Sequence, residues 1–362
     1  MKERIEYLSL PPGRRIIAIS DIHGNLPYLE GLLEKLRLQP EDIIIILGDF
    51  VEKGPQSLAT LRYIMALSEK YELHAICGNC DIWAPLFDGE MGNWADTVIP
   101  YMERKPYSLA RQMCEHLGIA FSPDMEYEPM RRRIMEYFAP ELEFLRKMPT
   151  LIETDDYVFV HGGVPEEKGD GWKYMKYDRF MDRAKPQKKW TIVGHWPVML
   201  YHEDTVEANP VFDYEKKIIS IDGGCVLKDD GQLNALIIPS AGSTDFSFLP
   251  YDPFPTAKVL TAQAASEKSW YIRWGDALVE VLERGEEFSR CRHKRTGYEM
   301  DILTKYLYGE GPECTVNDCT DYVLPLRPGD TVSIVEESSR GYFVKHNGVS
   351  GWYFGELEKE RT

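Results

Sequence analysis

The sequence is short of basic residues, of cysteine and of long apolar runs. Its 362 residues contain 42 Lys and Arg against 59 Asp and Glu, which gives a formal net charge of −17. Nucleic acids and anionic membranes both favour a basic surface, so the sequence predicts neither as a partner. A phosphate substrate stays open, because bound divalent cations would reverse the sign of the local field.

The seven cysteines are an odd number and form no dense framework, which is typical of a chain kept reduced in the cytoplasm. No apolar run reaches the length that spans a bilayer, and Met1–Leu10 lacks the apolar core of a signal peptide. The sequence contains no low-complexity tract and no clear repeat. We therefore expect a cytoplasmic protein away from membranes, long enough for two globular domains.

The first eighty residues alternate between strand and helix patterns. Short β-branched runs at Ile16–Ile19, Ile43–Leu47 and Leu73–Cys77 predict buried parallel strands. Leucines at helical spacing follow Pro27 and Pro55, where helices can begin. A βαβαβ order of this kind predicts an α/β fold with a parallel sheet and helices outside it.

The rest of the chain divides into further stretches. Residues 82–149 show helical spacing and predict an insertion, which either caps the site or only covers the sheet. Strand patterns return at residues 156–160, 190–193, 218–221 and 233–238. Residues 239–265 are rich in Pro, Ser and Thr, and beyond them short strand runs between turns predict a small all-β barrel. We expect a catalytic domain at 1–250, a linker at 251–269 and a β-rich domain at 270–362.

Polar residues follow the ends of the predicted strands. Parallel strands end at one edge of a sheet, so these residues are expected to lie close together. Converging carboxylates and imidazoles are unfavourable unless a divalent metal binds them, and mixed N and O ligands suit Mn, Fe or Zn. The set comprises Asp21, His23, Asp49, Asn79, His161 and His195. A single Asp after a strand is equally compatible with a helix N-cap, so the prediction depends on the whole set.

In this arrangement two metals share one carboxylate. Asp21 and His23 would bind the first metal, and Asp49 would bridge both. The remaining three residues are neutral, so the second metal would leave a net positive charge that attracts phosphate. Metals roughly 3.5–4 Å apart turn a water between them into hydroxide near neutral pH, so the set predicts a hydrolase.

Five motifs occur in a fixed order: SDIHGN, GDFVEKG, GNCD, VHGGV and VGHWPV. Together they resemble the metallophosphoesterase superfamily, and within it the phosphoprotein phosphatase family, which includes bacterial Ser/Thr phosphatases and symmetrical diadenosine tetraphosphatases. The similarity spans residues 14–239, and the GHW and IDGG pieces are similar to the latter group. The resemblance implies a four-layer α/β/β/α metallophosphoesterase sandwich with two divalent metal ions, Mn before Fe or Zn.

Two places depart from the family pattern. The family usually has Asp and Arg where Glu52 and Lys53 stand, and Lys offers a point charge where Arg binds two phosphate oxygens. The family usually has His, a general acid toward the leaving oxygen, where Cys80 stands. We expect Cys80 near the substrate but not essential, with a packed small side chain as the alternative. Asp81 would orient the site or cap a helix.

The resemblance extends to roles for single residues. The expected catalytic residues are Asp49, Lys53, Cys80 and Asp81. The expected substrate-binding residues are Lys53, Asn79, Arg131 and Arg179. Other cations that could contact phosphate are Arg132, Arg133, Lys173 and Lys176, although solvated surface charge is the commoner outcome for such residues.

Three weaker features remain. Asp222 is interpreted as a partner of a histidine ligand rather than a turn residue. The group Cys291, His293, Cys314 and Cys319 could bind zinc, but its spacing fits no common finger. The run Asp321–Leu357 resembles a bacterial SH3-like domain at about 318–360, whose aromatics would bind a peptide partner or only pack.

The sequence leaves three functions open. The first is a metal-dependent phosphoric ester hydrolase similar to Ser/Thr protein phosphatases, which cleaves phosphomonoesters through a metal-bridging hydroxide. The second is a nucleotide polyphosphate or phosphodiester hydrolase similar to diadenosine tetraphosphatase. The third is a weakly catalytic scaffold that binds phosphorylated ligands, which the altered GNCD and VEKG motifs suggest. The partner is then a phosphorylated protein or a nucleotide.

Overall fold

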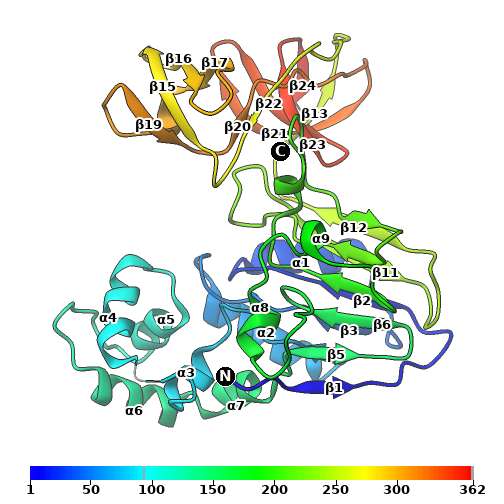
Figure 1. The fold of residues 1–362 in the computed structure, drawn as a ribbon, viewed down its shortest axis with the longest axis vertical. Coiled ribbons are helices and arrows are strands. Elements are labelled where there is room, and N and C mark those ends of the chain that lie inside the picture. The colour runs from blue at the N-terminus through cyan, green and yellow to red at the C-terminus, as the bar shows by residue number, and fades with distance from the viewer. Residues whose placement is uncertain (93, 360–362) are drawn as a thin grey trace. The chain divides into compact units, whose positions relative to one another are not determined.

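The computed structural model describes residues 1–92 and 94–359 (Figure 1). They form two compact units, each described by itself below. The first unit comprises Met1–Pro197, Pro210–Leu227 and Gly231–Asp252. The second comprises Val198–Asn209, Lys228–Asp230 and the residues from Pro253 onward. None of the helices in the described ranges combines the length and the apolar character that crossing a bilayer requires.

One sheet of the first unit is built around the predicted βαβαβ segment. Its strand order is β12 (Ser247–Tyr251), β11 (Leu233–Ile238), β2 (Ile16–Ile19), β3 (Ile43–Ile46) and β4 (Glu72–Ala75). The last three strands are parallel, as predicted, with α1 (Leu26–Leu36) and α2 (Ser57–Ser68) between them. In α1 a proline stands in the first turn, and Leu29, Leu32 and Leu33 are buried.

The second sheet of this unit packs face to face on the first. Its order is β1 (Ile5–Tyr7), β5 (Leu151–Glu153), β6 (Tyr157–Val160), β7 (Trp190–Val193), β10 (Ile218–Ser220) and β9 (Val211–Asp213). A shared apolar core joins the sheets, in which Ile43 and Ile45 meet Phe159 and Ile192 at zero exposure. Each such side chain contributes roughly 1.5–3 kcal/mol. The short helices α8 (Gly171–Met175) and α9 (Phe180–Arg183) lie between β6 and β7.

Residues 82–149 contain helices, as predicted. These are α3 (Trp83–Phe87), α4 (Ala95–Arg104), α5 (Leu109–His116), α6 (Tyr127–Tyr137) and α7 (Ala139–Lys147). Their apolar faces join the core that α1 and α2 form on the outer side of the first sheet. In Figure 1 they are the blue-cyan to green helices at the side of the unit.

The second unit is mostly strands. One sheet has the order β24 (Leu357–Lys359), β13 (Thr256–Val259), β21 (Thr331–Ser338), β22 (Gly341–His346), β23 (Val349–Tyr353) and β8 (Val206–Glu207). Another has the order β17 (Glu299–Leu303), β16 (Phe288–His293), β15 (Leu278–Glu283), β19 (Glu313–Val316) and β18 (Leu307–Tyr308). The second unit also contains a two-stranded sheet of β14 (Tyr271–Ile272) and β20 (Cys319–Thr320). Its 3₁₀ turns are η1 (Val198–Tyr201) and η2 (Thr304–Tyr306).

The predicted linker at 251–269 differs from the structure. It contains β13, which pairs with β21 and β24, so this segment is part of a sheet. The boundary at 250 also misses that Val198–Asn209 belongs to the second unit. The SH3-like identity of the C-terminal strands stays a prediction.

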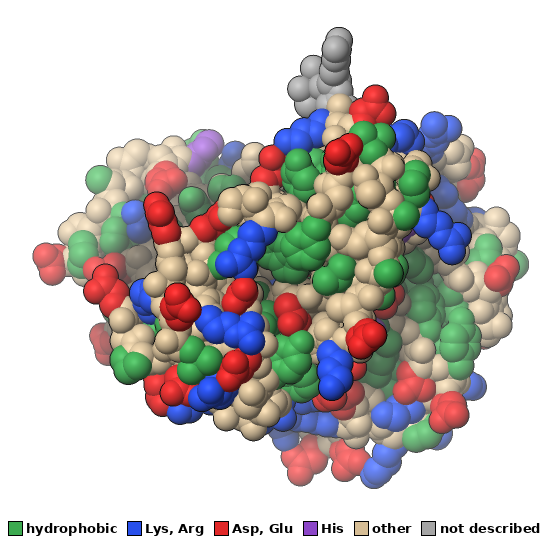
Figure 2. Space-filling view, turned by 90° about the horizontal axis from the view of Figure 1, so that it is seen from above, with side chains coloured by type: hydrophobic (Ala, Val, Ile, Leu, Met, Phe, Trp, Pro, Cys, Tyr) green, Lys and Arg blue, Asp and Glu red, His purple; other side chains and the backbone are tan. Residues whose placement is uncertain are grey.

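The zinc alternative finds no support in the packing. Cys291, Cys314 and Cys319 lie in an apolar cluster, and both ring nitrogens of His293 have hydrogen-bond partners. The three cysteines therefore behave as small buried side chains. On the face that Figure 2 shows, acidic and basic side chains lie interspersed among hydrophobic ones, so that face offers mixed charge.

Candidate metal centre

Strand ends bring the six predicted ligands to one edge of the two sheets. The loops after β2 and β3 are joined by backbone hydrogen bonds from Asp21 N to Gly48 O (3.1 Å) and from His23 N to Asp49 O (2.9 Å). Four ligands have left-handed backbones, with φ of 55° at Asp21, 50° at His23, 50° at Asp49 and 65° at His195. Such strain in non-glycine residues gathers at functional sites, where the surrounding structure holds it.

Two glycines allow the loops to approach this closely. A Cβ at Gly194 would lie 1.8 Å from Ser20 Oγ and 2.4 Å from Asp21 Oδ2. A Cβ at Gly78 would lie 2.2 Å from Asp49 Oδ1. Only glycine fits at either place, because the side chains of Ser20 and Asp21 fill the space at Gly194, and the backbone and carboxylate of Asp49 fill it at Gly78.

Asp49 lies at the centre of the group. Its Oδ2 is 3.9 Å from His23 Nε2, while its Oδ1 is 3.3 Å from His161 Nε2. Asp21 Oδ1 lies 3.6 Å from His23 Nε2 on the first side. Potential ligand atoms of Asp49, His161 and His195 lie within 4.8 Å of one another on the second side. The carboxylate of Asp49 therefore faces two groups of ligands with different oxygens.

Hydrogen bonds select which imidazole nitrogen is available to a metal. His161 Nδ1 lies 2.7 Å from the carbonyl oxygen of Leu47, which accepts its proton and leaves Nε2 for a metal. His195 Nε2 lies 2.8 Å from Asp178 Oδ1, which leaves Nδ1. Metal-binding histidines usually donate their other N–H to a carbonyl or carboxylate in this way. Sequence reasoning missed Asp178, because no motif surrounds it.

The centre contains buried polar atoms without partners. Among the described residues Asp21 Oδ1, Asn79 Oδ1 and His161 Nε2 are inaccessible and make no hydrogen bond. Buried polar atoms are almost always paired, so each unpaired one requires an explanation. Oxygen and imidazole donors around a central carboxylate fit divalent cations such as Mn, Fe or Zn.

The charges of the metal-free centre are strongly interdependent. Burial disfavours the charged form of Asp49, but the neighbouring His161, His23 and Lys53 hold its pKa well below the usual range. Burial also opposes protonation of His161, yet Asp49 and Asp21 raise its pKa to about 10. Burial and the charge of His161 lower the pKa of His195 to about 4. The positive charge held at His161 thus partly replaces the charge that metals would supply, and metal binding would release protons.

Comparison with known proteins shows the family of this chain. A family model described as calcineurin-like phosphoesterase matches residues 14–221, more than half of the chain. This chain belongs to the calcineurin-like phosphoesterase family. Members of this family use a dinuclear divalent metal centre, and the two ligand groups around Asp49 are candidates for holding one.

Two proteins with similar sequences match parts of this chain. A symmetrical bis(5'-nucleosyl)-tetraphosphatase of Pseudomonas syringae pv. syringae (strain B728a) is 43% identical over 68 residues, 18% of this chain and 23% of that protein. One of Cellvibrio japonicus (strain Ueda107) is 29% identical over 154 residues, 41% of this chain and 44% of that protein. The chain therefore spans less than half the length of these relatives.

Solved structures are similar at low sequence identity. A protein serine/threonine phosphatase from Saccharomyces cerevisiae with similarity to human phosphatase PP5 is 13% identical and covers 69% of this chain and 84% of its own, with a TM-score of 0.41. A metallophosphoesterase from Sphaerobacter thermophilus is 18% identical and covers 66% and 88%, with a TM-score of 0.37.

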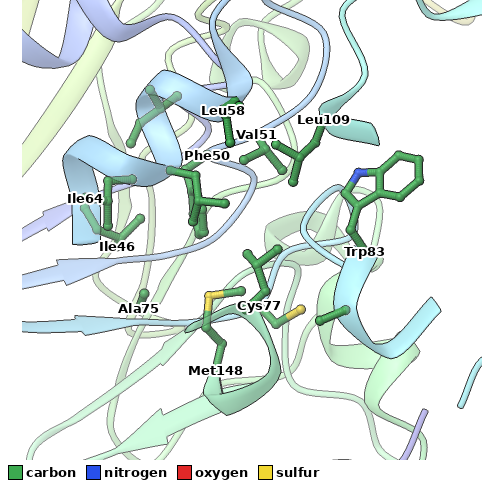
Figure 3. Close-up of a cluster of buried hydrophobic side chains, with 14 of the residues drawn as sticks. Ile46, Phe50, Val51, Leu58, Ile64, Ala75, Cys77, Trp83, Leu109 and Met148 are labelled. Carbon is green, nitrogen blue, oxygen red and sulfur yellow. The ribbon is translucent and has the colours of Figure 1, made fainter. Parts of the chain in front are cut away.

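Buried contacts of Asp81, Phe50 and Val51 hold the loop after β3 against the core of the first unit. Asp81 accepts hydrogen bonds from the backbone N–H of Asp49 (2.6 Å), Gly78 (2.9 Å), Phe50 (3.2 Å) and Val51 (3.3 Å). Phe50 and Val51 point into the apolar cluster with Leu58 and Leu109 (Figure 3). The buried Asp81 carboxyl thus faces the loop backbone, and burial together with Asp49 raises its pKa to about 7.

Glu52 and Lys53 point in different directions. Each Glu52 oxygen accepts hydrogen bonds from the insertion, from Trp83 Nε1 and Leu109 N on one side and Tyr101 OH on the other, all at 2.7 Å. Lys53 Nζ instead lies 3.1 Å from His23 Nε2. Burial disfavours its charge, but the acidic groups around it raise its pKa, so it stays an ammonium beside the centre.

Cys80 lies at the rim of the centre. Its sulfur is 3.3 Å from Asn79 Nδ2, and its backbone N–H donates to Asp49 Oδ1 at 2.8 Å. The side chain is half-buried, and ligand atoms of His23, Asp49 and Cys80 lie within 4.8 Å of one another. Burial and the charge of Asp49 raise the pKa of the thiol well above its ordinary value. The thiol is therefore close to the predicted metals but a poor acid.

Two predicted phosphate contacts are engaged elsewhere. Arg131 Nε donates to the carbonyl of Phe87 at 2.5 Å, within the insertion. Arg179 Nε donates to Asp182 at 2.7 Å, and its side chain is exposed. Among the described residues neither contacts the six predicted ligands, so their role toward substrate stays a prediction. Asp222 is fully buried and accepts a hydrogen bond from the backbone N–H of Gly224 at 2.8 Å, while burial together with Asp21 raises its pKa. Its role as the partner of a histidine ligand stays a prediction.

Proposed function

We propose that this phosphoesterase hydrolyses a phosphate ester at a dinuclear centre. The residues that would hold the two metals are Asp21, His23, Asp49, Asn79, His161 and His195. The observation that supports this most is the group of unpaired, buried ligand atoms around the Asp49 carboxylate. Two divalent cations bound there would polarise the phosphoryl oxygens and generate a nucleophile from water at neutral pH.

The chain's own residues would position the substrate and the ligands. Lys53 would contact one phosphate oxygen as a point charge from beside His23. Asp178 and the carbonyl of Leu47 would fix the tautomers of the two histidines. Asp81 would act as a positioning residue through the backbone of the loop that carries Asp49.

The thiol of Cys80 bears on the substrate class. A thiol whose pKa burial raises is a weak acid, so it would give little help to a strongly basic leaving oxygen. A nucleoside phosphate leaves from a phosphoanhydride as a weak base, whereas serine leaves as a strongly basic alkoxide. We therefore place nucleotide polyphosphates first among substrates, in keeping with the names of the curated relatives. Phosphoserine and phosphothreonine in proteins are the second candidate, which the ordered set of five motifs supports.

A substrate panel tests the proposal. The full chain is loaded with Mn, Fe or Zn and assayed on diadenosine tetraphosphate, p-nitrophenyl phosphate, bis-p-nitrophenyl phosphate and a phosphoserine peptide. We expect turnover of the first with two metals bound per chain. Two bound metals without turnover of any substrate would instead favour a scaffold that only binds phosphorylated ligands.

A further inference from the structure

A basic pocket lies beside the metal centre in the first unit. Its volume is about 270 Å³. The side chains that line it are Pro165, Lys173, Lys176, Tyr177, Asp178 and Arg183. Half of them are cations, although acidic residues outnumber basic ones in the chain by 59 to 42. A concave site with this lining would favour an anion.

Asp178 joins the pocket to the metal centre. Its carboxylate lines the pocket and accepts a hydrogen bond from His195 Nε2 at 2.8 Å. The ring of His195 is in turn 5.2 Å from that of His161, between centroids. The pocket and the predicted second metal therefore lie on opposite sides of one imidazole. A substrate with several linked phosphates is therefore the class of ligand that can reach both the metals and the pocket.

The cations of the pocket are incompletely neutralised. Lys173 pairs with Glu167 at 2.6 Å, and Lys176 lies 3.6 Å from Asp178. The side chain of Arg183 makes no ion pair or hydrogen bond within residues 1–92 and 94–359. Asp182, the other nearby acid, already accepts a hydrogen bond from Arg179. Arg183 thus supplies a guanidinium whose planar donors suit phosphate oxygens.

We propose that this pocket binds a further phosphate group of the substrate while another phosphate lies on the metals. The ligand class is a phosphoanhydride chain, as in a nucleoside polyphosphate. This proposal rests on the proposed function. It adds that the site selects substrates that carry more than one linked phosphate. Arg183, which sequence reasoning did not single out, replaces Arg179 as the arginine that contacts substrate.

The experiment compares substrates that differ in the number of phosphates. Arg183→Ala and Lys173→Ala are assayed in the metal-loaded full chain on diadenosine tetraphosphate and on p-nitrophenyl phosphate. Lys176 is left intact, because it neighbours the Asp178 that holds His195. Lys185→Ala is the matched control, since Lys185 belongs to the same segment, pairs with Glu166 and does not line the pocket.

We expect Arg183→Ala to raise KM for diadenosine tetraphosphate about tenfold or more, the usual effect of a hydrogen bond to a charged group. KM for p-nitrophenyl phosphate should change much less, and Lys185→Ala should change neither. Equal changes on both substrates, or no change on either, would overturn the proposal. A selective loss on a phosphopeptide with acidic neighbours would also overturn it, because the pocket would then bind peptide carboxylates.

A binding measurement separates this proposal from the proposed function. Calorimetric titration with methylenediphosphonate, which is not hydrolysed, is compared with titration of inorganic phosphate. We expect Arg183→Ala to weaken only the diphosphonate, even in a preparation that turns over no substrate. If the two ligands weaken equally, the second subsite is absent, whatever the activity.

Discussion

Two buried carboxylates stand three residues apart in one loop, and their surroundings are opposite. Asp49 lies among imidazoles at 3.3 and 3.9 Å, in a group with unpaired ligand atoms. Glu52 has accepted three hydrogen bonds at 2.7 Å from an indole, a phenol and a backbone N–H. Both charges are costly to bury, and protein donors satisfy both oxygens of Glu52, whereas Asp49 accepts a hydrogen bond from the N–H of Cys80 and faces two imidazoles. The comparison separates a carboxylate that we propose binds metal from one that holds the helical insertion.

Replacing Asp49 is expected to have the largest effect on activity. Asp49→Asn should lower turnover roughly 10³-fold or more, because one oxygen of the carboxylate that would serve both metals becomes an amide nitrogen. Metal content should fall from two per chain, measured by elemental analysis, while the melting temperature of the metal-free protein changes little. The exposed Asp155→Asn is the control. Turnover within tenfold of the parent would mean that Asp49 does not bridge.

Replacing Glu52 should lower stability and leave metal binding intact, the reverse of the effect expected at Asp49. Glu52→Ala leaves Trp83, Tyr101 and Leu109 without their acceptor, and we expect a loss of about 3–5 kcal/mol in the free energy of unfolding. Chemical denaturation measures this, with the exposed Glu90→Ala as control. The protein that stays folded should still bind two metals. Loss of metal without loss of stability would make Glu52 part of the centre.

The sequence predicted those elements whose apolar pattern is strong. The strands at Ile16–Ile19 and Ile43–Ile46 are confirmed, because fully buried parallel strands are β-branched throughout. The strand β12 escaped prediction because Pro250 made its segment resemble a linker, but proline is tolerated in an edge strand, where β12 lies. The strand β13, predicted as part of a linker, follows the same Pro-rich stretch.

The site was predictable where motifs follow strands, and not where partners come from elsewhere. Asp49 and His161 stand directly after apolar runs, so the topology alone placed them together. Asp178 lies in an irregular segment, and only the tertiary fold brings it to His195. The departure at Glu52 was visible in the sequence, but its purpose depends on helices of the insertion that no local pattern connects to it.

The difference between the two carboxylates should also appear in the pH dependence of stability. Burial raises the pKa of Glu52 from 4.5 to about 7. Between these values the folded protein keeps a proton that the unfolded chain has lost, so the contribution of Glu52 to stability falls as pH rises and is lowest above 7. Relative to Glu52→Gln, the free energy of unfolding should fall by about 3 kcal/mol from pH 4 to pH 8. A flat difference in metal-free protein would contradict the raised pKa.

Replacing Asp178 should have the smallest effect, because this third carboxylate would act on the metal only through His195. It also tests how the ligands divide between the two metals. Asp178 is partly exposed, accepts the 2.8 Å hydrogen bond from His195 Nε2 and lies 3.6 Å from Lys176. Removing such a partner of a metal ligand typically costs 10–100-fold in metal affinity. Asp178→Ala should therefore weaken binding of the second Mn by that factor in calorimetric titration, and leave the first Mn unchanged. Asp178→Asn keeps an acceptor oxygen and should recover part of the loss. Asp182→Ala, four residues further on and paired with Arg179, is the matched control. If both metals weaken equally, or if neither does, His195 does not belong to one metal alone and the division of ligands around Asp49 must be redrawn.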